Sequence, residues 1–327
     1  MLRIMVGPDD LAVSRFAVSP LGELEHLLRH LGGTGGQHNR LPSPIRTRWR
    51  ERFAQVRHDP GVRAILALQI SAYGANFVAP PPNGVAQTLD DDLAAVRATP
   101  LSLARAEIST ALAPGPAPEP RIARWLSRPD VVDQIADSLQ MAWTALIAPD
   151  WPQLQAIIER DVVHRAGQLT RTGWAGALAG MHPTVAWHNA TVQIRKRPNG
   201  QARLDGRGLL FVPSVFIYPG LGIYLDPPWR PALVYPARGS AALWAAQPRP
   251  PGSLRRLLGA SRANLLVALD TPTSTTQLVA TTGMSLGAVG GHLRIMLDAG
   301  LLTRARSGRT VLYQRTPVAE ALLGTTE

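Results

Sequence analysis

The sequence predicts an α+β protein: a mainly helical N-terminal region with an antiparallel β-meander, followed by a small C-terminal module of helices and one hairpin. Helical apolar patterns, several opened by proline, fill most of residues 1–180, and short β-branched and aromatic runs fill 185–244. Helical patterns return in the last quarter. We therefore expect a domain at 1–245, a Pro-rich linker at 246–252 and a second domain at 253–327.

Proline marks several of the expected N-terminal helix starts, where the missing amide hydrogen costs nothing. The expected helices are Leu21 to Leu31, Pro44 to Val56, Pro100 to Leu112, Pro120 to Leu126, Val131 to Leu146 and Trp151 to Leu178. The strand-like runs are Val185 to Trp187, Val192 to Ile194, Gly208 to Val212, Val215 to Tyr218, Gly222 to Leu225 and Ala232 to Tyr235. Turn residues separate these runs, so we expect an antiparallel meander packed on the helices.

Two capped helices follow one another in the last quarter. Thr275 or Ser274 can cap the first, and Gly283 ends it. Ser285 caps the second, and Gly300 stops it. The apolar residues of this second helix fall on one face at helical spacing, and they are Val289, Leu293, Met296 and Leu297.

A hairpin is expected directly after these helices. Leu301 to Arg304 and Thr310 to Gln314 are extended runs joined through the turn dipeptide Ser307-Gly308. Helices followed by a two-stranded wing and a short last helix are the order of a winged helix-turn-helix, a fold that places its second helix in the DNA major groove.

Composition is compatible with a folded protein of two domains. The chain has 327 residues, 45% of them hydrophobic, and no apolar run approaches the ~18 residues of a membrane helix. The N-terminus lacks a basic stretch followed by an apolar segment, and cysteine is absent. We expect a cytoplasmic bacterial protein without disulfides or thiolate metal sites.

The charge favours a polyanionic partner, with a net charge of +11 and a pI near 11.2. Among the 34 basic residues only Lys196 is lysine, which together with 29 Gly and 29 Pro indicates a GC-rich coding bias and reduces the weight of the charge. From Ser253 onward the sequence contains eight arginines and four acidic residues, which gives a net charge of +4. Arg304, Arg306 and Arg309 flank the expected hairpin tip.

The C-terminal module resembles the ArsR-type winged-helix repressors of bacteria. The matching residues are Arg262 to Leu269, Ser285, Val289, His292-Leu293, Leu297, Ala299-Gly300-Leu301, Gly308-Arg309 and Leu312-Tyr313. The resemblance implies operator binding by a homodimer that pairs through the first and last helices of the module. Because the last helix is short here, the N-terminal domain is expected to supply much of the dimer interface. The alternative is a winged helix that contacts protein instead of DNA.

Ten residues are candidate DNA contacts. Thr275, Thr276 and the exposed amides near Ser285 suit phosphates, and the wing arginines suit a minor groove. The full set is Thr275, Thr276, Ser285, Ala288, Gly291, His292, Arg294, Arg304, Arg306 and Arg309. Where the family has a Val-Ser pair, this chain has Val289-Gly290-Gly291, so side-chain readout of bases is reduced and DNA shape gains importance.

Metal, cofactor and catalytic sites are not expected. The module lacks the family's cysteines, and Val318 to Leu323 contains no His pair. No phosphate-binding loop or nucleophile elbow is present. Asp161, His164 and Arg165 lie within one helical turn, but such a group on a helix surface is usually a solvated salt bridge.

The N-terminal residues resemble an uncharacterised domain that precedes this winged helix in actinobacterial regulators. The matching residues are Ser19-Pro20-Leu21, Asp150-Trp151, Gly206 to Phe216 and Leu233 to Gly239. We predict a homodimeric repressor that binds operator DNA and senses a small molecule through residues 1–245, without contact to a membrane. The alternatives are an enzyme or ligand-binding domain with a DNA-binding tail, and a constitutive DNA-binding protein without an effector.

Overall fold

The computed structural model describes residues 1–33, 43–69, 75–195, 199–240, 250–269, 272–307 and 310–324. The chain forms two compact units. Unit 1 consists of Met1–Asp150 with Thr172–Ala237, and unit 2 consists of Trp151–Arg171 with Arg238–Glu327. The grouping of 151–171 with the C-terminal residues was not suggested by the sequence.

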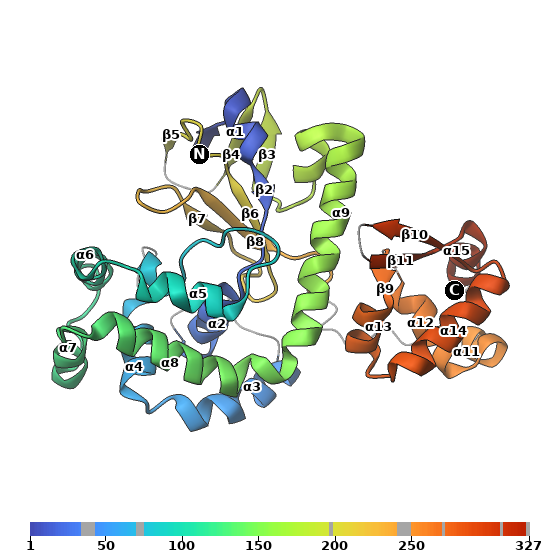
Figure 1. The fold of residues 1–327 in the computed structure, drawn as a ribbon, viewed down its shortest axis with the longest axis horizontal. Coiled ribbons are helices and arrows are strands. Elements are labelled where there is room, and N and C mark those ends of the chain that lie inside the picture. Colours follow the sequence, from blue (N-terminus) through green and yellow to red (C-terminus); the bar gives the residue numbers. More distant parts are fainter. Residues whose placement is uncertain are drawn as a thin grey trace. The chain divides into compact units, whose positions relative to one another are not determined.

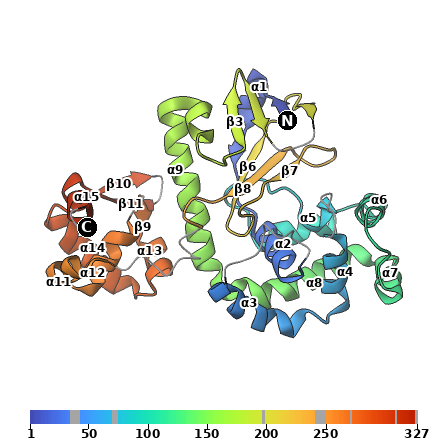
Figure 2. The same cartoon turned by 180° about the vertical axis from the view of Figure 1, so that it is seen from behind.

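Unit 1 has a helical layer at one end, visible in both views (Figure 1, Figure 2). The helices of this layer are α2 (Pro20–Leu31), α3 (Ser43–Val56), α4 (Pro60–Leu68), α5 (Leu89–Arg97), α6 (Leu101–Leu112), α7 (Pro120–Leu126) and α8 (Val131–Leu146). The short helix α1 (Pro8–Val13) lies at the opposite end of unit 1, beside strands (Figure 1). Helices α2, α3, α4 and α5 all contact α8, which is apolar along one side. Ser19, Asp59 and Thr88 cap α2, α4 and α5 with side-chain oxygens. The predicted helices before Trp151 are confirmed.

The first sheet of unit 1 has the strand order β3-β4-β1-β5. Its strands are β1 (Leu2–Met5), β3 (Val185–His188), β4 (Thr191–Ile194) and β5 (Gly200–Arg203). β3 and β4 form a tight hairpin, with Asn189 and Ala190 at positive φ in its turn. The N-terminal strand β1 lies between β4, antiparallel, and β5, parallel.

The second sheet has the order β2-β6-β8-β7 and lies between the first sheet and the helical layer (Figure 1). Its strands are β2 (Arg15–Phe16), β6 (Leu210–Ser214), β7 (Gly222–Tyr224) and β8 (Ala232–Pro236). β6 runs parallel to both β2 and β8, and only the β7–β8 pair is antiparallel. Both β6 and β8 are buried almost throughout, as is usual for parallel strands.

The predicted antiparallel meander is therefore wrong. The strands of 185–236 divide between two sheets, because the N-terminal strands β1 and β2 join them from the other end of the chain. Val215 to Tyr218, expected as a strand, is instead a turn. The carboxyl group of Glu23 accepts hydrogen bonds from the amides of Val215 (3.0 Å) and Phe216 (3.3 Å), which removes them from any strand ladder.

Helix α9 (Trp151–Leu178) belongs to both units. Its backbone leaves helical geometry at Gly173, where φ is 67°, a conformation that glycine adopts without strain. The single helix expected from Trp151 to Leu178 is therefore interrupted. Trp174 lies just beyond the interruption and packs on the rings of Phe16 and Phe211 in unit 1.

The C-terminal residues of unit 2 form a small α/β module. Its elements are α11 (Gly252–Leu258), α12 (Ala260–Ala268), β9 (Thr273–Ser274), α13 (Thr275–Thr282), α14 (Leu286–Asp298), β10 (Leu302–Ser307), β11 (Thr310–Arg315) and α15 (Pro317–Gly324). β10 and β11 pair antiparallel, and the short β9 adds to β11 to give a three-stranded sheet. Ser274, rather than Thr275, caps α13, and the predicted cap at Ser285 opens α14.

The module has its own apolar core. Val289, Leu293 and Met296 of α14 are buried as predicted, and Leu297 is half-buried against the same cluster. Leu266 of α12 and Leu278 of α13 complete the contact between the three helices. The opposite face of α14 is consequently turned outward.

Candidate nucleic-acid interface and interior pocket

The outward face of α14 and its N-cap carry four of the candidate DNA contacts. Ser285, Ala288, Gly291 and Arg294 are exposed, and all four were candidates from the sequence. The Ser285 hydroxyl accepts a hydrogen bond from the Ala288 amide (3.3 Å), which begins the helix. Arg294 forms no ion pair with any residue that the structure describes, so its guanidinium group is available to an outside anion.

Three glycines leave open space along α14. A Cβ atom built on Gly287, Gly290 or Gly291 would meet no heavy atom within 4 Å. None of these glycines is therefore required by packing against the rest of the chain. Each lowers the helix-forming tendency by roughly 1 kcal/mol relative to alanine. The smooth surface they create lets another backbone or a groove wall approach the helix closely.

Helix α13 precedes this face and presents its first turn. Thr276 is exposed and Thr275 is half-buried. The Ser274 hydroxyl accepts from the Gln277 amide (3.2 Å), and the Gln277 side chain accepts from the Ser274 amide (2.8 Å). This reciprocal capping box holds the start of α13 rigid.

The hairpin places two candidate arginines on one face. Arg304 and Arg306 are two residues apart in β10, so their side chains leave the strand on the same side, and both are exposed. Arg304 pairs across the hairpin with Tyr313, and Arg306 with Val311. Arg309, the third candidate at the tip, lies outside the described residues. Arg315, at the base of β11, is held by an ion pair with Glu320 (2.9 Å).

His292 is only half-buried, but its Nδ1 atom is buried and meets no hydrogen-bond partner among the described residues. Leu286 and Ile295 were missed by the sequence reasoning: their side chains are 61% and 50% exposed on α14. Ile295 falls outside the inward stripe of Val289, Leu293 and Met296, which is the signal that could have identified it. Leu286 precedes Val289 by three residues and Leu293 by seven, so the helical pattern places it on that stripe, and it is exposed at the first position of the helix.

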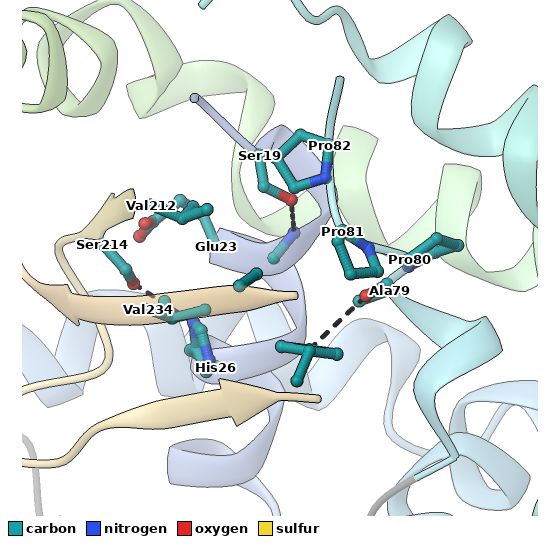
Figure 3. Close-up of a pocket in the computed structure, with 13 residues that line it drawn as sticks. Ser19, Glu23, His26, Ala79, Pro80, Pro81, Pro82, Val212, Ser214 and Val234 are labelled. Atoms are coloured by element: carbon teal, nitrogen blue, oxygen red, sulfur yellow. Dashed lines mark hydrogen bonds between the residues drawn. The ribbon is translucent and has the colours of Figure 1, made fainter. Parts of the chain in front are cut away.

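A second candidate site lies within unit 1, between α2 and the carboxyl end of β6 (Figure 3). Figure 3 shows Glu23 and His26 of α2, Ser214 of β6, and the prolines of 80–82 around this space. The cavity measures about 20 Å³, roughly what a single water molecule requires.

Burial sets the chemistry of this cavity. It raises the pKa of Glu23 to about 7, against the hydrogen bonds from Ser214, Val215 and Phe216 that favour the ionised form. Burial also lowers the pKa of His26 to about 4, although the neighbouring Glu25 carboxylate opposes this effect. At neutral pH His26 is therefore uncharged.

Ser214, His26 and Glu25 lie in the order of a nucleophile, its base and an acid, with a hydrogen bond only between the first two. Ser214 Oγ lies 3.1 Å from His26 Nδ1, and His26 Nε2 lies 3.5 Å from Glu25. The amides after Ser214 are already bonded to Glu23, so they do not form an oxyanion hole. Because the cavity has room for only about one water, the arrangement supports a structural role for this series.

The N-terminus of α2 at the edge of this cavity is also occupied. Asp92 of α5 accepts a hydrogen bond from the Leu21 amide (2.8 Å) and another from the Gln87 side chain (2.9 Å). The Ser19 hydroxyl oxygen accepts a hydrogen bond from the Gly22 amide (3.0 Å). Burial raises the pKa of Asp92 to about 7.

A larger groove lies elsewhere in unit 1, with a volume of about 420 Å³. Apolar side chains line most of it and three charged residues stand among them; the lining includes Leu31, Phe53, Leu66, Leu112, Ile122, Arg57, Arg63 and Glu119. Arg63 pairs with Glu119. This volume is within the range of small-molecule sites.

Asp161 and His164 do not form the solvated pair expected from the sequence, because Asp161 is buried and pairs with Arg165. Asp161 is 1% exposed, and its carboxylate accepts from Arg165 Nε (3.1 Å) and from the Arg238 amide (3.0 Å). His164 instead lies beside the Arg238 guanidinium group. The described residues contain no cluster of three or more His, Asp or Glu side chains that could hold a metal ion. Within the same ranges, no helix combines the length and the apolar character needed to cross a membrane.

Comparison with protein families finds a match over part of the chain. The model of a family of unknown function, DUF5937, matches residues 86–241. This segment contains the helices α5 to α9 and the strands β3 to β8, and it ends before the C-terminal module. No curated protein and no solved structure matches the chain.

Proposed function

We propose that residues 252–324 are a winged helix-turn-helix and that the protein is a DNA-binding transcriptional regulator, acting as a homodimeric repressor. The observation that carries the proposal is the exposed set Ala288, Gly291 and Arg294 on α14 together with Arg304 and Arg306 on β10. One capped helix with an open face and one cationic hairpin are the two elements that enter DNA grooves in such proteins. The likeness of the module to ArsR-type repressors supports the same function.

In this proposal the helices α13 and α14 and the β10–β11 hairpin contact different parts of the DNA. The amides at the start of α14 and the hydroxyl of Thr276 bind phosphates, and Arg294 binds beside the helix. Arg306 and Arg309 of the hairpin enter a minor groove, where a narrow width strengthens the negative potential. Two modules related by a two-fold axis would bind two half-sites about one DNA turn apart.

Unit 1 would supply regulation. We propose that the groove of about 420 Å³ receives a small effector, because the cavity at Glu23 holds little more than one water. An effector that binds one geometry of the dimer better than another shifts operator affinity by that difference.

The test is selection of duplexes from a random DNA library by the full-length protein, followed by anisotropy titrations at several salt concentrations. The expected result is enrichment of one palindromic sequence and a linear fall of log affinity with log salt. The double variant Arg294→Ala, Arg304→Ala lacks two proposed phosphate contacts and should bind the selected DNA more weakly. No enrichment, and equal binding by the double variant, would exclude the proposed function.

A further inference from the structure

The start of α14 offers apolar groups where a DNA-reading helix usually carries hydrogen-bonding side chains. Between Leu286 and His292 the residues are Leu, Gly, Ala, Val, Gly, Gly and His. His292 alone in this stretch has a polar side chain, and it is half-buried. Arg, Asn, Gln, Asp and Glu, which read guanine, adenine and cytosine through hydrogen bonds, are missing from these two turns.

Leu286 is the bulky group in this stretch that projects into solvent, and 61% of it is exposed. It is the first residue of the helix, directly after the Ser285 cap. Ala288, two residues further and about 200° around the helix axis, is also exposed in this first turn, and Gly287 between them leaves open space around the backbone. The N-terminal turn of a recognition helix is the part that meets base edges.

Resting on the proposed function, we propose that this turn recognises the C5-methyl groups of thymine, so that the preferred operator half-site carries A·T pairs where Leu286 and Ala288 face the major groove. The methyl group is the apolar feature that distinguishes a thymine edge in that groove, and apolar side chains contact it. The partner proposed for the side chains of Leu286 and Ala288 is thus the floor of a major groove that contains A·T pairs.

Positive charges on α14 and on the hairpin favour binding of the negatively charged DNA to this part of the module. Arg294, about two turns beyond Leu286 in α14, and Arg304 on the hairpin are exposed and form no ion pair with described residues. Both can bind phosphates on either side of the groove. With no long side chain at Gly287 or Gly291, the helix backbone can lie close enough for Leu286 and Ala288 to reach the methyl groups.

The closing experiment changes the DNA and leaves the protein intact. A duplex selected by the full-length protein is resynthesised with deoxyuridine in place of each thymidine in turn, which removes one methyl group and keeps base pairing. We expect roughly fourfold weaker binding at each contacted position, the value of burying one methyl group. A 5-methylcytosine·guanine pair at such a position should bind more tightly than cytosine·guanine.

Leu286→Ala should bind the thymidine and deoxyuridine duplexes equally at the position that faces it. Ile295→Ala is the matched control: its side chain is 50% exposed on the same helix but lies in the C-terminal half, so it should keep the full difference. A selected duplex whose binding is insensitive to deoxyuridine at every position would overturn the methyl recognition while leaving DNA binding intact. Failure to select any duplex would instead remove the proposed function, and the inference with it.

Discussion

The side-chain amide of Gln277 donates a hydrogen bond of 3.2 Å to the carboxylate of Glu159, which lies 118 residues earlier in the chain. The same side chain completes the capping box with Ser274 at the start of α13. Glu159 also accepts from Gln155, one turn before it in α9. Within unit 2, the first turn of α13 is therefore held both by its own cap and by α9.

Removing this contact should loosen α13. We expect Glu159→Ala to lower the free energy of unfolding by about 1 kcal/mol, the usual worth of one hydrogen bond, and to weaken DNA binding. Glu159→Gln retains an acceptor oxygen and should restore most of both. Denaturant unfolding and anisotropy titration measure the two effects. Equal stability of the native chain and Glu159→Ala would show that α13 is held by its cap alone.

The wing should contribute charge to DNA binding. Replacing Arg306 and Arg309 with Ala is expected to weaken binding and to reduce the salt slope by about two, because two positive charges that lie close to the phosphates and the minor groove are lost. The double variant Arg121→Ala, Arg128→Ala removes the same charge from exposed positions of unit 1 and is the control. DNA-binding titrations from low to moderate salt measure the affinity and its salt slope. If both double variants lose the same affinity and the same slope, the wing makes no specific contribution.

Gly290 gives a test of the missing hydroxyl on α14. Since a Cβ atom there meets nothing within 4 Å, Gly290→Ser should fit without displacing a neighbour. We expect higher thermal stability from better helix propensity and tighter DNA binding from a new phosphate contact. Gly290→Ala separates the two effects, because it stabilises the helix without adding a hydroxyl. Weaker DNA binding by both variants would mean that the helix backbone itself must approach the DNA.

The buried acid Asp92 predicts a dependence of stability on pH. Burial raises its pKa from 3.8 to about 7, so between these values the folded chain keeps a proton that the unfolded chain releases. Its contribution therefore falls as the pH rises from about 4 to 7. Glu23, with a pKa raised to about 7, acts in the same direction, whereas His26, with a pKa lowered to about 4, acts in the opposite one.

We accordingly expect the melting temperature to fall between pH 5 and pH 8, and Asp92→Asn to reduce this fall. Circular dichroism melting curves across the range provide the measurement, with the exposed Asp90→Asn as control. An unchanged slope in Asp92→Asn would show that Asp92 is ionised in the fold throughout.

The sequence predicted local structure better than long-range pairing. The helices opened at Pro20, Pro100 and Pro120 and the caps at Ser274 and Ser285 could be found because each depends on a few adjacent residues. The strand order of the two sheets could not be found from the sequence, because β1 and β2 are short and their partner strands lie almost two hundred residues away. Parallel pairing of β6 had a signal, the unbroken apolar run of 209–212, which was interpreted as part of a meander.

Among the candidate contacts, exposure of Ala288, Gly291, Arg294, Arg304 and Arg306 followed from helical and strand periodicity. The contact between Glu159 and Gln277 could not be found, since no local pattern marks two polar residues that meet only through tertiary structure.

Unit 1 carries its own carboxyl groups at the positions where open sheets of parallel strands usually receive ligands. Asp92 fills the amide end of α2, and Glu23 fills the amides that follow β6. A phosphorylated metabolite would have to displace acids that are tethered by the chain and therefore present at high local concentration. Nucleotides and sugar phosphates should accordingly compete poorly at these strand ends, and an effector acting there would be neutral or cationic.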